Sequence, residues 1–257
     1  MNIEPVARVR TPYPVKFGVP RQPGLVDALE SRVLFEPAFR NPDAVRGLEG
    51  FGHVWLVWGF SHNVTDGSGA PRPWSPTVRP PVLGGTRRVG VFASRSSFRP
   101  NGLAISAVRL LGVEPDAPYG DGTRGPVLRV GGADMVDGSP VYDVKPYLPA
   151  SDSHPGTPAG WRDGVVWPEL EVDFPAELLE AVPRRLREGL LQVLRQDPRP
   201  GYVRGGFEDR LYWVPLEDVV VRFSVRGRVL TVVEVRRLDA SEMRRLRETG
   251  TVEGLES

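Results

Sequence analysis

Cysteine is absent from this 257-residue chain. Its absence excludes thiol nucleophiles, thiolate zinc sites, iron–sulfur clusters and disulfide frameworks. Only three histidines are present, His53, His62 and His154, so we expect no metal centre. No apolar stretch approaches the roughly 20 residues that a membrane-spanning helix needs, and residues 1–10 lack the apolar core of a signal peptide. These absences predict a cytoplasmic protein that binds neither a membrane nor a metal.

Lysine is also scarce, because only Lys16 and Lys145 among the 33 Lys and Arg residues are lysines. The net charge of +1 is unevenly distributed along the chain. Between Gly67 and Val113 there are seven arginines and no Asp or Glu, so this stretch carries +7 and the rest of the chain −6. Such a local positive field can bind phosphate groups although the whole chain is nearly neutral.

Frequent prolines and glycines (27 and 29) divide the chain into short segments. Most segments in the first 150 residues have the alternating or continuous apolar pattern of strands. The predicted strands are Pro5–Arg10, His53–Phe60, Val89–Ala93, Ile105–Val113, Val127–Gly131 and Val141–Lys145. The lack of a strand–GxGxxG–helix unit disfavours a Rossmann fold. The spacing of these segments predicts a mainly β N-terminal domain at residues 1–155, built as a barrel or a sandwich.

The composition changes after a Pro- and Gly-rich stretch, Ala150–Gly164, which we interpret as a linker. Leucines at helical spacing predict a helix over Pro175–Arg195, and Pro183 is expected to split it. Strands are predicted at Arg210–Val214, Val219–Val225 and Val229–Val235, followed by a charged helix at Ala240–Thr249. This pattern predicts a small α+β C-terminal domain at residues 165–257.

A loop with two prolines and two glycines covers Lys16–Gly24. Prolines fix the backbone, and glycines let it approach a ligand closely. Gln22–Gly24 could therefore offer an amide and main-chain groups to a flat heterocycle, while Lys16 and Arg21 meet anions. The alternative is an ordinary rigid turn.

Arginines, serines and the aromatics Phe92 and Phe98 alternate within Thr77–Gly102. Arginine presents a planar fork suited to phosphate or carboxylate, and aromatics among arginines suit unstacked bases. A second such segment, Gln196–Gly205, carries Arg199, Tyr202 and Arg204. The alternatives are a solvated basic loop for the first segment and a helix-ending turn for the second.

The segment Asp134–Tyr147 contains the most reactive combination of side chains. Asp137-Gly138 resembles a hairpin turn, and in a following strand Asp143, Lys145 and Tyr147 would share one face. Lys145 would keep Asp143 ionised, which makes Asp143 a candidate base. The alternative is a surface ion pair on an edge strand, which contributes little stability.

Six segments together resemble the TsaA-like family, the tRNA N6-threonylcarbamoyladenosine methyltransferases. Their sequences are KFGVPRQPG (Lys16–Gly24), DAVRGLEGF (Asp43–Phe51), TVRPPVLGG (Thr77–Gly85), GVFASRSSFRPN (Gly90–Asn101), DMVDGSPVYDVKPYLP (Asp134–Pro149) and QDPRPGY (Gln196–Tyr202). They follow the family order over almost the whole chain. The resemblance departs at Ser75, where the family has an arginine, and at Gly102-Leu103-Ala104, where it has Pro-Ile-Gly.

The resemblance implies a mostly antiparallel β-barrel-like fold for the N-terminal domain. It also implies an enzyme that uses S-adenosylmethionine to methylate N6 of threonylcarbamoyladenosine next to the tRNA anticodon. It also implies a homodimer with the cofactor near the subunit interface. The implied cofactor contacts are Gln22, Pro23, Gly24, Phe60, Ser61, Arg95, Ile105, Gly131, Gly132, Ala133 and Asp134. Arg95 would pair with the methionyl carboxylate and Asp134 with the ribose hydroxyls.

We expect Asp143, assisted by Lys145 and Tyr147, to accept the proton that N6 loses. The anticodon stem-loop would be bound by Lys16, Arg21, Arg79, Arg88, Arg99, Arg199, Tyr202 and Arg204. Two alternatives stay open on the sequence alone. One is a non-catalytic module that binds tRNA or S-adenosylmethionine, and the other is a small-molecule hydrolase that uses the Asp143 face.

Overall fold

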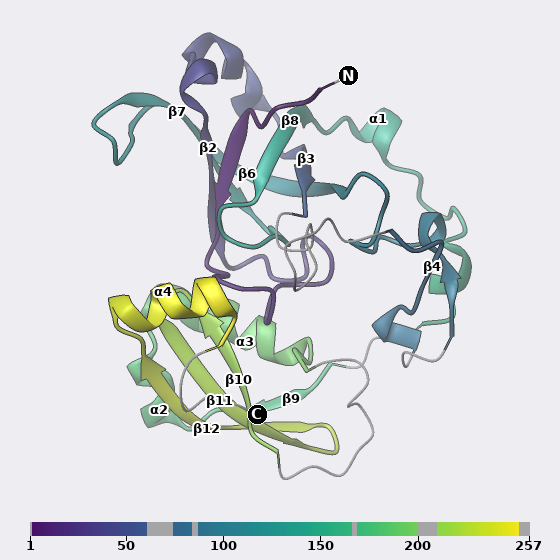
Figure 1. Cartoon of the computed structure of the whole chain (residues 1–257), viewed down its shortest axis with the longest axis vertical. Helices are drawn as coiled ribbons and strands as arrows, with labels where there is room; N and C mark the ends of the chain where they lie inside the picture. The colour runs from purple at the N-terminus through teal and green to yellow at the C-terminus, as the bar shows by residue number, and fades with distance from the viewer. Residues whose placement is uncertain (1, 61–73, 84–86, 166–168, 200–209, 252–257) are drawn as a thin grey trace. The chain divides into compact units, whose positions relative to one another are not determined.

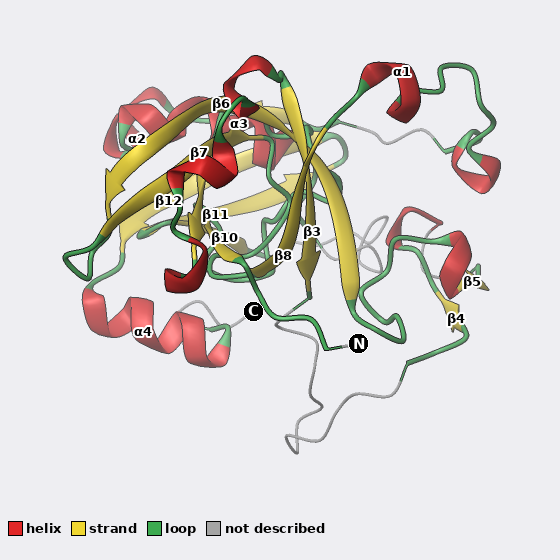
Figure 2. Cartoon of the chain, turned by 90° about the horizontal axis from the view of Figure 1, so that it is seen from above, coloured by secondary structure: helices red, strands yellow, loops and turns green. Residues whose placement is uncertain are grey.

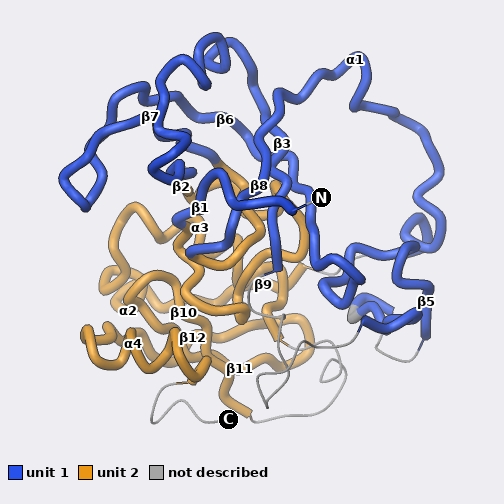
Figure 3. Tube along the Cα trace, turned by 45° about the horizontal axis from the view of Figure 1, so that its top comes forward, with its two compact units in different colours: residues 1–10, 32–130, 138–167 blue, residues 11–31, 131–137, 168–257 orange. Residues whose placement is uncertain are grey.

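The computed structural model describes residues 2–60, 74–83, 87–165, 169–199 and 210–251. The chain forms two compact units, and neither is continuous in sequence (Figure 3). The first unit consists of residues 1–10, 32–130 and 138–167, and the second of residues 11–31, 131–137 and 168–257. Two segments of the first 155 residues therefore pack with the C-terminal part of the chain.

A closed barrel of six strands forms the first unit, as the sequence predicted (Figure 1). In their order around the barrel the strands are β1 (Ala7–Arg10), β2 (Glu30–Phe35), β7 (Arg124–Gly131), β6 (Leu103–Pro118), β3 (His53–Gly59) and β8 (Pro140–Pro146). Side chains alternate between the two faces of a strand. In β3, Val54, Leu56 and Trp58 are buried inside the barrel, whereas Trp55 and Val57 are only half-buried.

Three local predictions for the first unit were wrong or incomplete. The strand predicted at Val89–Ala93 is only β5 (Val89–Gly90), which pairs with β4 (Thr77–Val78), and Val91–Ala93 is a 3-10 turn. Asp137-Gly138 does not close a hairpin, because β7 and β8 are not neighbours in the barrel. The sequence analysis also missed β2, because the polar residue Ser31 occupies a buried position and three consecutive apolar residues, Val33, Leu34 and Phe35, hide the alternation.

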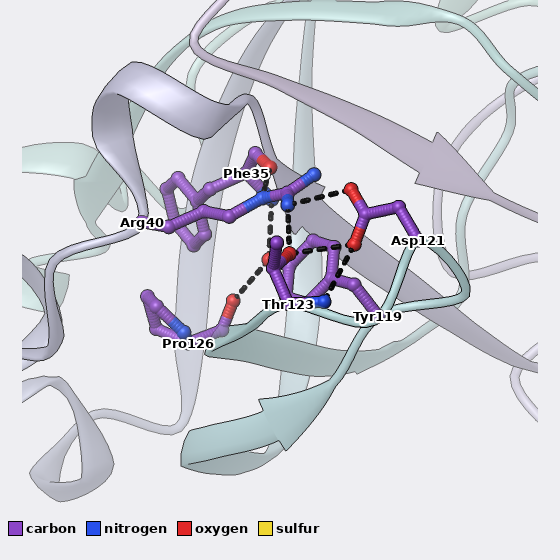
Figure 4. Close-up of polar contacts among 6 residues, drawn as sticks. All are labelled: Phe35, Arg40, Tyr119, Asp121, Thr123 and Pro126. Atoms are coloured by element: carbon purple, nitrogen blue, oxygen red, sulfur yellow. Dashed lines mark hydrogen bonds and ion pairs between the residues drawn. The ribbon is translucent and has the colours of Figure 1, made fainter.

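The loop between β6 and β7 is braced by Arg40, whose guanidinium lies 3.9 Å from the centre of the Tyr119 ring (Figure 4). Arg40 also donates to the Phe35 carbonyl at 3.0 Å, to Thr123 and to Asp121 at 2.9 Å. Hydrogen bonds from Thr123 and Arg40 lower the pKa of Asp121 below its usual range. This network connects the segment that follows β2 to the loop between β6 and β7.

The second unit is built on a four-stranded sheet. Its order is β10 (Tyr212–Leu216), β11 (Val219–Arg226), β12 (Val229–Arg237) and β9 (Glu171–Asp173), and β9 is the one strand that runs parallel to its neighbour. The predicted strands at 210–235 are confirmed with shifted ends, whereas β9 was not predicted.

Helices cover both faces of this sheet (Figure 2). As predicted, Pro183 separates α2 (Ala176–Ala181) from α3 (Arg184–Arg195). Leu186 and Leu190 of α3 pack with one face of β11, including Val221, while Leu246 of α4 packs with Val220 on the opposite face.

The remaining helices are short and begin at recognisable signals. Helix α4 (Ala240–Thr249) begins with a capping box, in which the Asp239 carboxylate accepts from the Glu242 amide and the Glu242 carboxylate accepts from the Asp239 amide. It ends at Gly250, whose φ of 75° suits a left-handed helix cap. The four-residue helix α1 (Pro149–Asp152) begins one residue before the predicted linker, Ala150–Gly164, and includes its first three residues.

Residues 11–31 contribute to the core of the second unit. Tyr13, Val26 and Leu29 belong to the same buried cluster as the apolar side chains of α3. Leu29 is 3% exposed and lies directly over Gly189 in that helix. A β-carbon at position 189 would be only 2.2 Å from Leu29 Cγ, so the missing side chain of Gly189 makes room for Leu29.

We expect Gly189→Ala to destabilise the second unit. Overpacking against Leu29 should lower the free energy of unfolding by about 1–3 kcal/mol. The higher helix propensity of alanine than of glycine offsets about 1 kcal/mol of this loss. Urea unfolding followed by circular dichroism measures the change. Gly52→Ala is the control, because a β-carbon there meets nothing within 4 Å. A Gly189→Ala midpoint at or above that of the unmodified chain would contradict this packing.

Candidate functional site

Two glycine-containing loops meet within the second unit. The Gly24 amide donates to the Gly132 carbonyl at 2.9 Å, and both glycines have a positive φ, 80° and 78°. A β-carbon on Gly132 would lie 3.0 Å from both the Gly24 amide nitrogen and its Cα. The predicted cofactor segments Gln22–Gly24 and Gly131–Asp134 are thus joined backbone to backbone, and a side chain at Gly132 would push them apart by a few tenths of an ångström.

The first of these loops is anchored on both sides by the C-terminal part of the second unit. Before it, Arg21 donates to the carbonyls of Asp197 and Arg199 at 3.4 and 3.1 Å. After it, the Gln192 side chain on α3 donates to Asp27 at 2.9 Å and accepts from the Ala28 amide at 3.1 Å. These contacts fix the approach of the loop to Gly132.

A buried hydroxyl lies close to the second loop. Tyr13 is 1% exposed, and within the part of the chain that the structure describes its hydroxyl has no hydrogen-bond partner. Burial and the nearby Asp134 carboxylate both raise the Tyr13 pKa above its ordinary value. The hydroxyl therefore stays protonated and can donate to a ligand. A buried polar group without a partner is unfavourable, so its presence beside the second loop fits a ligand that offers a polar group there.

The predicted catalytic pair lies on the outer surface of the barrel in the first unit. Lys145 Nζ is 2.9 Å from an Asp143 carboxylate oxygen, while the other oxygen accepts from the Val144 amide at 2.9 Å. Both side chains are about half-exposed or more, at 47% for Asp143 and 65% for Lys145. The predicted shared face of these two residues is confirmed by their ion pair.

The pairing register places a predicted cofactor contact on the same face. Val57 is the pairing partner of Asp143 on one side and of Ile105 on the other. Because directly paired residues point to the same face of a sheet, Ile105 and Asp143 flank Val57, about two strand spacings or 10 Å apart. Ile105 is 49% exposed. The outer face of the barrel therefore has exposed apolar surface next to the Asp143–Lys145 ion pair.

Tyr147 follows the end of β8, and its aromatic neighbours are known. Its amide donates to the His53 carbonyl at 3.0 Å, and its ring lies 6.0 Å from the His53 ring and 5.5 Å from the Trp55 ring. Trp55 is the pairing partner of Lys145. Tyr147 thus packs against Trp55, which lies next to Lys145 on the outer face of the barrel. Its proposed assistance to Asp143 stays a prediction.

The other predicted cofactor residues also belong to the first unit. The Phe60 amide donates to the Gly102 carbonyl at 2.9 Å, and its ring packs edge-on against Trp58 at 4.7 Å. Arg95 is exposed in the loop after the 3-10 turn at 91–93. Ser61 lies outside the described residues.

The predicted RNA-binding residues of the first unit lie on or near the β4–β5 hairpin. Arg79 is exposed, and Arg88 is exposed and donates to the Thr77 hydroxyl at 2.7 Å. Arg99 is partly buried and donates to the carbonyls of Ser94 at 2.7 Å and Val91 at 3.4 Å. Arg99 therefore orders this loop in addition to any contact with RNA.

The second unit holds the remaining predicted RNA contacts, in different settings. Lys16 is exposed, and Arg21 is the loop anchor described above. Arg199 is 7% exposed and forms a two-point ion pair with Asp197 at 2.8 and 3.1 Å. It orders the turn after α3, and its RNA contact stays an untested prediction. Tyr202 and Arg204 lie outside the described residues.

Sequence reasoning missed Tyr13, Gln192 and Asp27, which shape the site within the second unit. Their signals are weak, since each is a single residue in an unremarkable local pattern. These three residues take part in the site only because residues 11–31 pack against α3, and these two segments are far apart in the sequence.

Two further searches concern the described residues alone. No group of three or more His, Asp or Glu within them lies in a position to hold a metal ion. No helix in the same part of the chain is long and apolar enough to cross a membrane.

Comparison with known proteins gives matches over nearly the whole chain. Residues 8–153 match the model of the tRNA-methyltransferase O N-terminal domain, and residues 168–238 match that of the TrmO C-terminal domain. The chain is 41% identical over 230 residues to the tRNA (adenine(37)-N6)-methyltransferase of Escherichia coli K12, covering 87% of this chain and 93% of the relative.

A second relative and a solved structure agree with these matches. The Pseudomonas aeruginosa PAO1 protein named "Putative S-adenosylmethionine-dependent methyltransferase RcsF" is 36% identical, over 91% of this chain and 97% of its own length. The crystal structure of TrmO from P. aeruginosa superposes with a TM-score of 0.69 at 31% identity, covering 92% of this chain and 97% of that one.

The contact between the two glycine loops can be tested with a matched pair of substitutions. Gly132 and Gly122 both have a φ near 80°, but only Gly132 has a close neighbour. Both alanine variants carry the same backbone strain, so we expect only Gly132→Ala to push the loops apart. The Gly24 amide should then exchange with deuterium at least 10-fold faster, as measured by hydrogen–deuterium exchange. Equal protection of Gly24 in the two variants would show that the close approach does not hold the loop.

Proposed function

We infer, from the premise that this chain belongs to the tRNA-methyltransferase O family, that it is an S-adenosylmethionine-dependent methyltransferase acting on tRNA. It methylates N6 of the adenosine at position 37. The observation that carries this conclusion is the match of both family domains, in order, together with 41% identity over 87% of the chain.

The joined glycine loops fit the cofactor. S-adenosylmethionine supplies an activated methyl group when it is bound, and its adenosine part is a flat ring with two ribose hydroxyls. Main-chain groups of Gln22, Pro23 and Gly24 and of Gly131, Gly132 and Ala133 can approach such a ring, because glycine leaves the backbone uncovered. We propose that Asp134 accepts hydrogen bonds from the ribose and that the Tyr13 hydroxyl, which has no hydrogen-bond partner among the described residues, donates to the same ligand.

Further cofactor contacts are proposed in the first unit. Arg95 has the planar fork that pairs with a carboxylate and would hold the methionyl end. Phe60, Ser61 and Ile105 complete the contacts that the family pattern implies.

Asp143 is the proposed proton acceptor. The nitrogen N6 is a weak nucleophile while its lone pair is delocalised, so removal of its proton assists the reaction. The ion pair with Lys145 at 2.9 Å orients the carboxylate, and exposure leaves that carboxylate accessible to a large substrate. Tyr147 and Lys145 would position Asp143, and alignment of the reactants would supply most of the remaining rate.

We also propose a finer identity for the substrate and its binding surface. The acceptor is threonylcarbamoyladenosine in the anticodon loop. Lys16, Arg79 and Arg88 are exposed cations suited to its phosphates, and Arg21, Arg99 and Arg199 would act next to the RNA in addition to their contacts with the chain. Tyr202 and Arg204 complete the proposed set.

Two assembly-level proposals accompany this activity. We propose that the protein acts as a homodimer in the cytoplasm, where tRNA is found, with residues 1–155 as the methyltransferase domain and 165–257 as a tRNA-binding domain. The half-exposed apolar face around Ile105 and Val57 supports a contact with a second copy, because monomeric proteins seldom expose such faces.

Methyl transfer is tested directly with isotopically labelled S-adenosylmethionine. The protein is incubated with tRNA that carries threonylcarbamoyladenosine and with tRNA that lacks it, and the nucleosides are analysed by mass spectrometry. We expect label on N6 of the modified adenosine only. Binding of both ligands without any labelled nucleoside would contradict the enzymatic function, and equal labelling of both tRNAs would contradict the proposed substrate.

Asp143→Asn tests the proton acceptor. Loss of the base should lower kcat by about 10²- to 10⁴-fold, with the affinities for tRNA and cofactor changed little, because the amide keeps the size of the carboxylate. Single-turnover kinetics and separate binding titrations measure both effects. Asp116→Asn is the control, since Asp116 forms a similar exposed pair with Arg124 at 2.8 Å on strand β6. Full turnover in Asp143→Asn would refute the assignment.

A further inference from the structure

Two large aromatic side chains of the first unit are stacked on each other at the surface. The ring centres of Trp74 and Phe92 lie 6.5 Å apart with an interplanar angle of 27°. Trp74 is 49% exposed and Phe92 is 74% exposed, the highest value among the large apolar side chains that the structure describes. Exposed apolar surface of this kind usually marks a binding site.

The pair is held in place by the β4–β5 hairpin. Thr77 pairs with Gly90, and the Val91 amide donates to the Pro76 carbonyl at 3.0 Å, which brings the residues before β4 beside those after β5. Trp74 and Phe92 therefore meet at the same end of the hairpin.

Hydrogen bonds fix the backbone on both sides of Phe92. Arg99 donates to the carbonyls of Val91 and Ser94, and the Trp161 indole donates to the Ala93 carbonyl at 2.7 Å. The 3-10 turn at 91–93 thus presents the Phe92 ring outward from an ordered backbone. Exposure of this ring is a property of the fold, and little conformational entropy would be lost when a ligand stacks on it.

The surroundings of the pair are strongly cationic. Arg79, Arg87, Arg88 and Arg95 are exposed on the same hairpin and the loop that follows it. They belong to the stretch from Gly67 to Val113, which carries seven arginines and no Asp or Glu. Aromatic faces combined with a cationic surface are the features with which proteins bind single-stranded nucleic acid.

We propose that Trp74 and Phe92 form a stacking platform for an unpaired base of the tRNA anticodon loop, with the neighbouring arginines on its phosphates. This inference rests on the proposed function, because it assigns a contact to the same RNA substrate. Stacking tolerates any base, so the platform would hold the loop open while other groups select the modified adenosine.

A second copy of the chain is the other possible occupant, and the charges disfavour it. A two-fold interface places the same patch of both copies together. Here that would bring two clusters of arginines against each other, and like charges across an interface oppose binding. RNA supplies the complementary charge.

The test uses the full chain and an anticodon stem-loop with 2-aminopurine in the loop, whose fluorescence is quenched by stacking. Phe92→Leu and Trp74→Leu keep an apolar side chain but remove the aromatic face, whereas Phe92→Tyr retains it. We expect each leucine variant to weaken RNA binding by about 10-fold and to lose the quenching, and Phe92→Tyr to retain both. Phe39→Leu is the control, because Phe39 is a 40% exposed aromatic residue outside the cationic stretch.

Several outcomes would overturn the platform. The first is unchanged RNA affinity and quenching in both leucine variants. The second is loss of the proposed dimer by these variants in light scattering, which would make the pair a contact between copies. Methyl transfer by the unmodified protein is measured in the same series. If that protein methylates tRNA while the leucine variants bind RNA normally, only the platform fails. If it transfers no methyl group, the proposed function fails.

Discussion

One main-chain hydrogen bond, from the Gly24 amide to the Gly132 carbonyl, joins the two loops of the proposed cofactor site. Gly132 allows the close approach behind this bond, since a β-carbon there would be 3.0 Å from Gly24 and would push the two loops apart by a few tenths of an ångström. Glycine also leaves uncovered the peptide groups that we propose a flat ring approaches. One close backbone contact therefore shapes both the local fold and the proposed cofactor site.

The interrupted architecture of the chain brings these two loops together. Residues 11–31 and 131–137 leave the barrel and pack with α3 and its following turn in the second unit. Leu29 over Gly189, and Gln192 beside Asp27 and Ala28, fix the first loop where it can reach the second. The C-terminal part of the chain thus shapes the loops that the family pattern assigns to the cofactor, whereas the barrel presents Asp143 and Lys145 on its own outer face.

Features encoded locally could be predicted from the sequence. Pro183 divides two helices because it cannot continue one, Asp239 and Glu242 cap α4, and the two-residue period of a strand places Asp143 beside Lys145. Features that depend on distant partners could not be predicted. The charged strand β2 is held by its barrel neighbours, and the stack of Trp74 on Phe92 exists only once β4 and β5 pair.

The most direct test of this account is a crystal structure of the protein with S-adenosylmethionine. The account predicts that the adenine and ribose lie within hydrogen-bonding distance of main-chain groups of residues 22–24 and 131–133, with the Asp134 carboxylate on the ribose hydroxyls. Density for the ligand away from both glycine loops would contradict it.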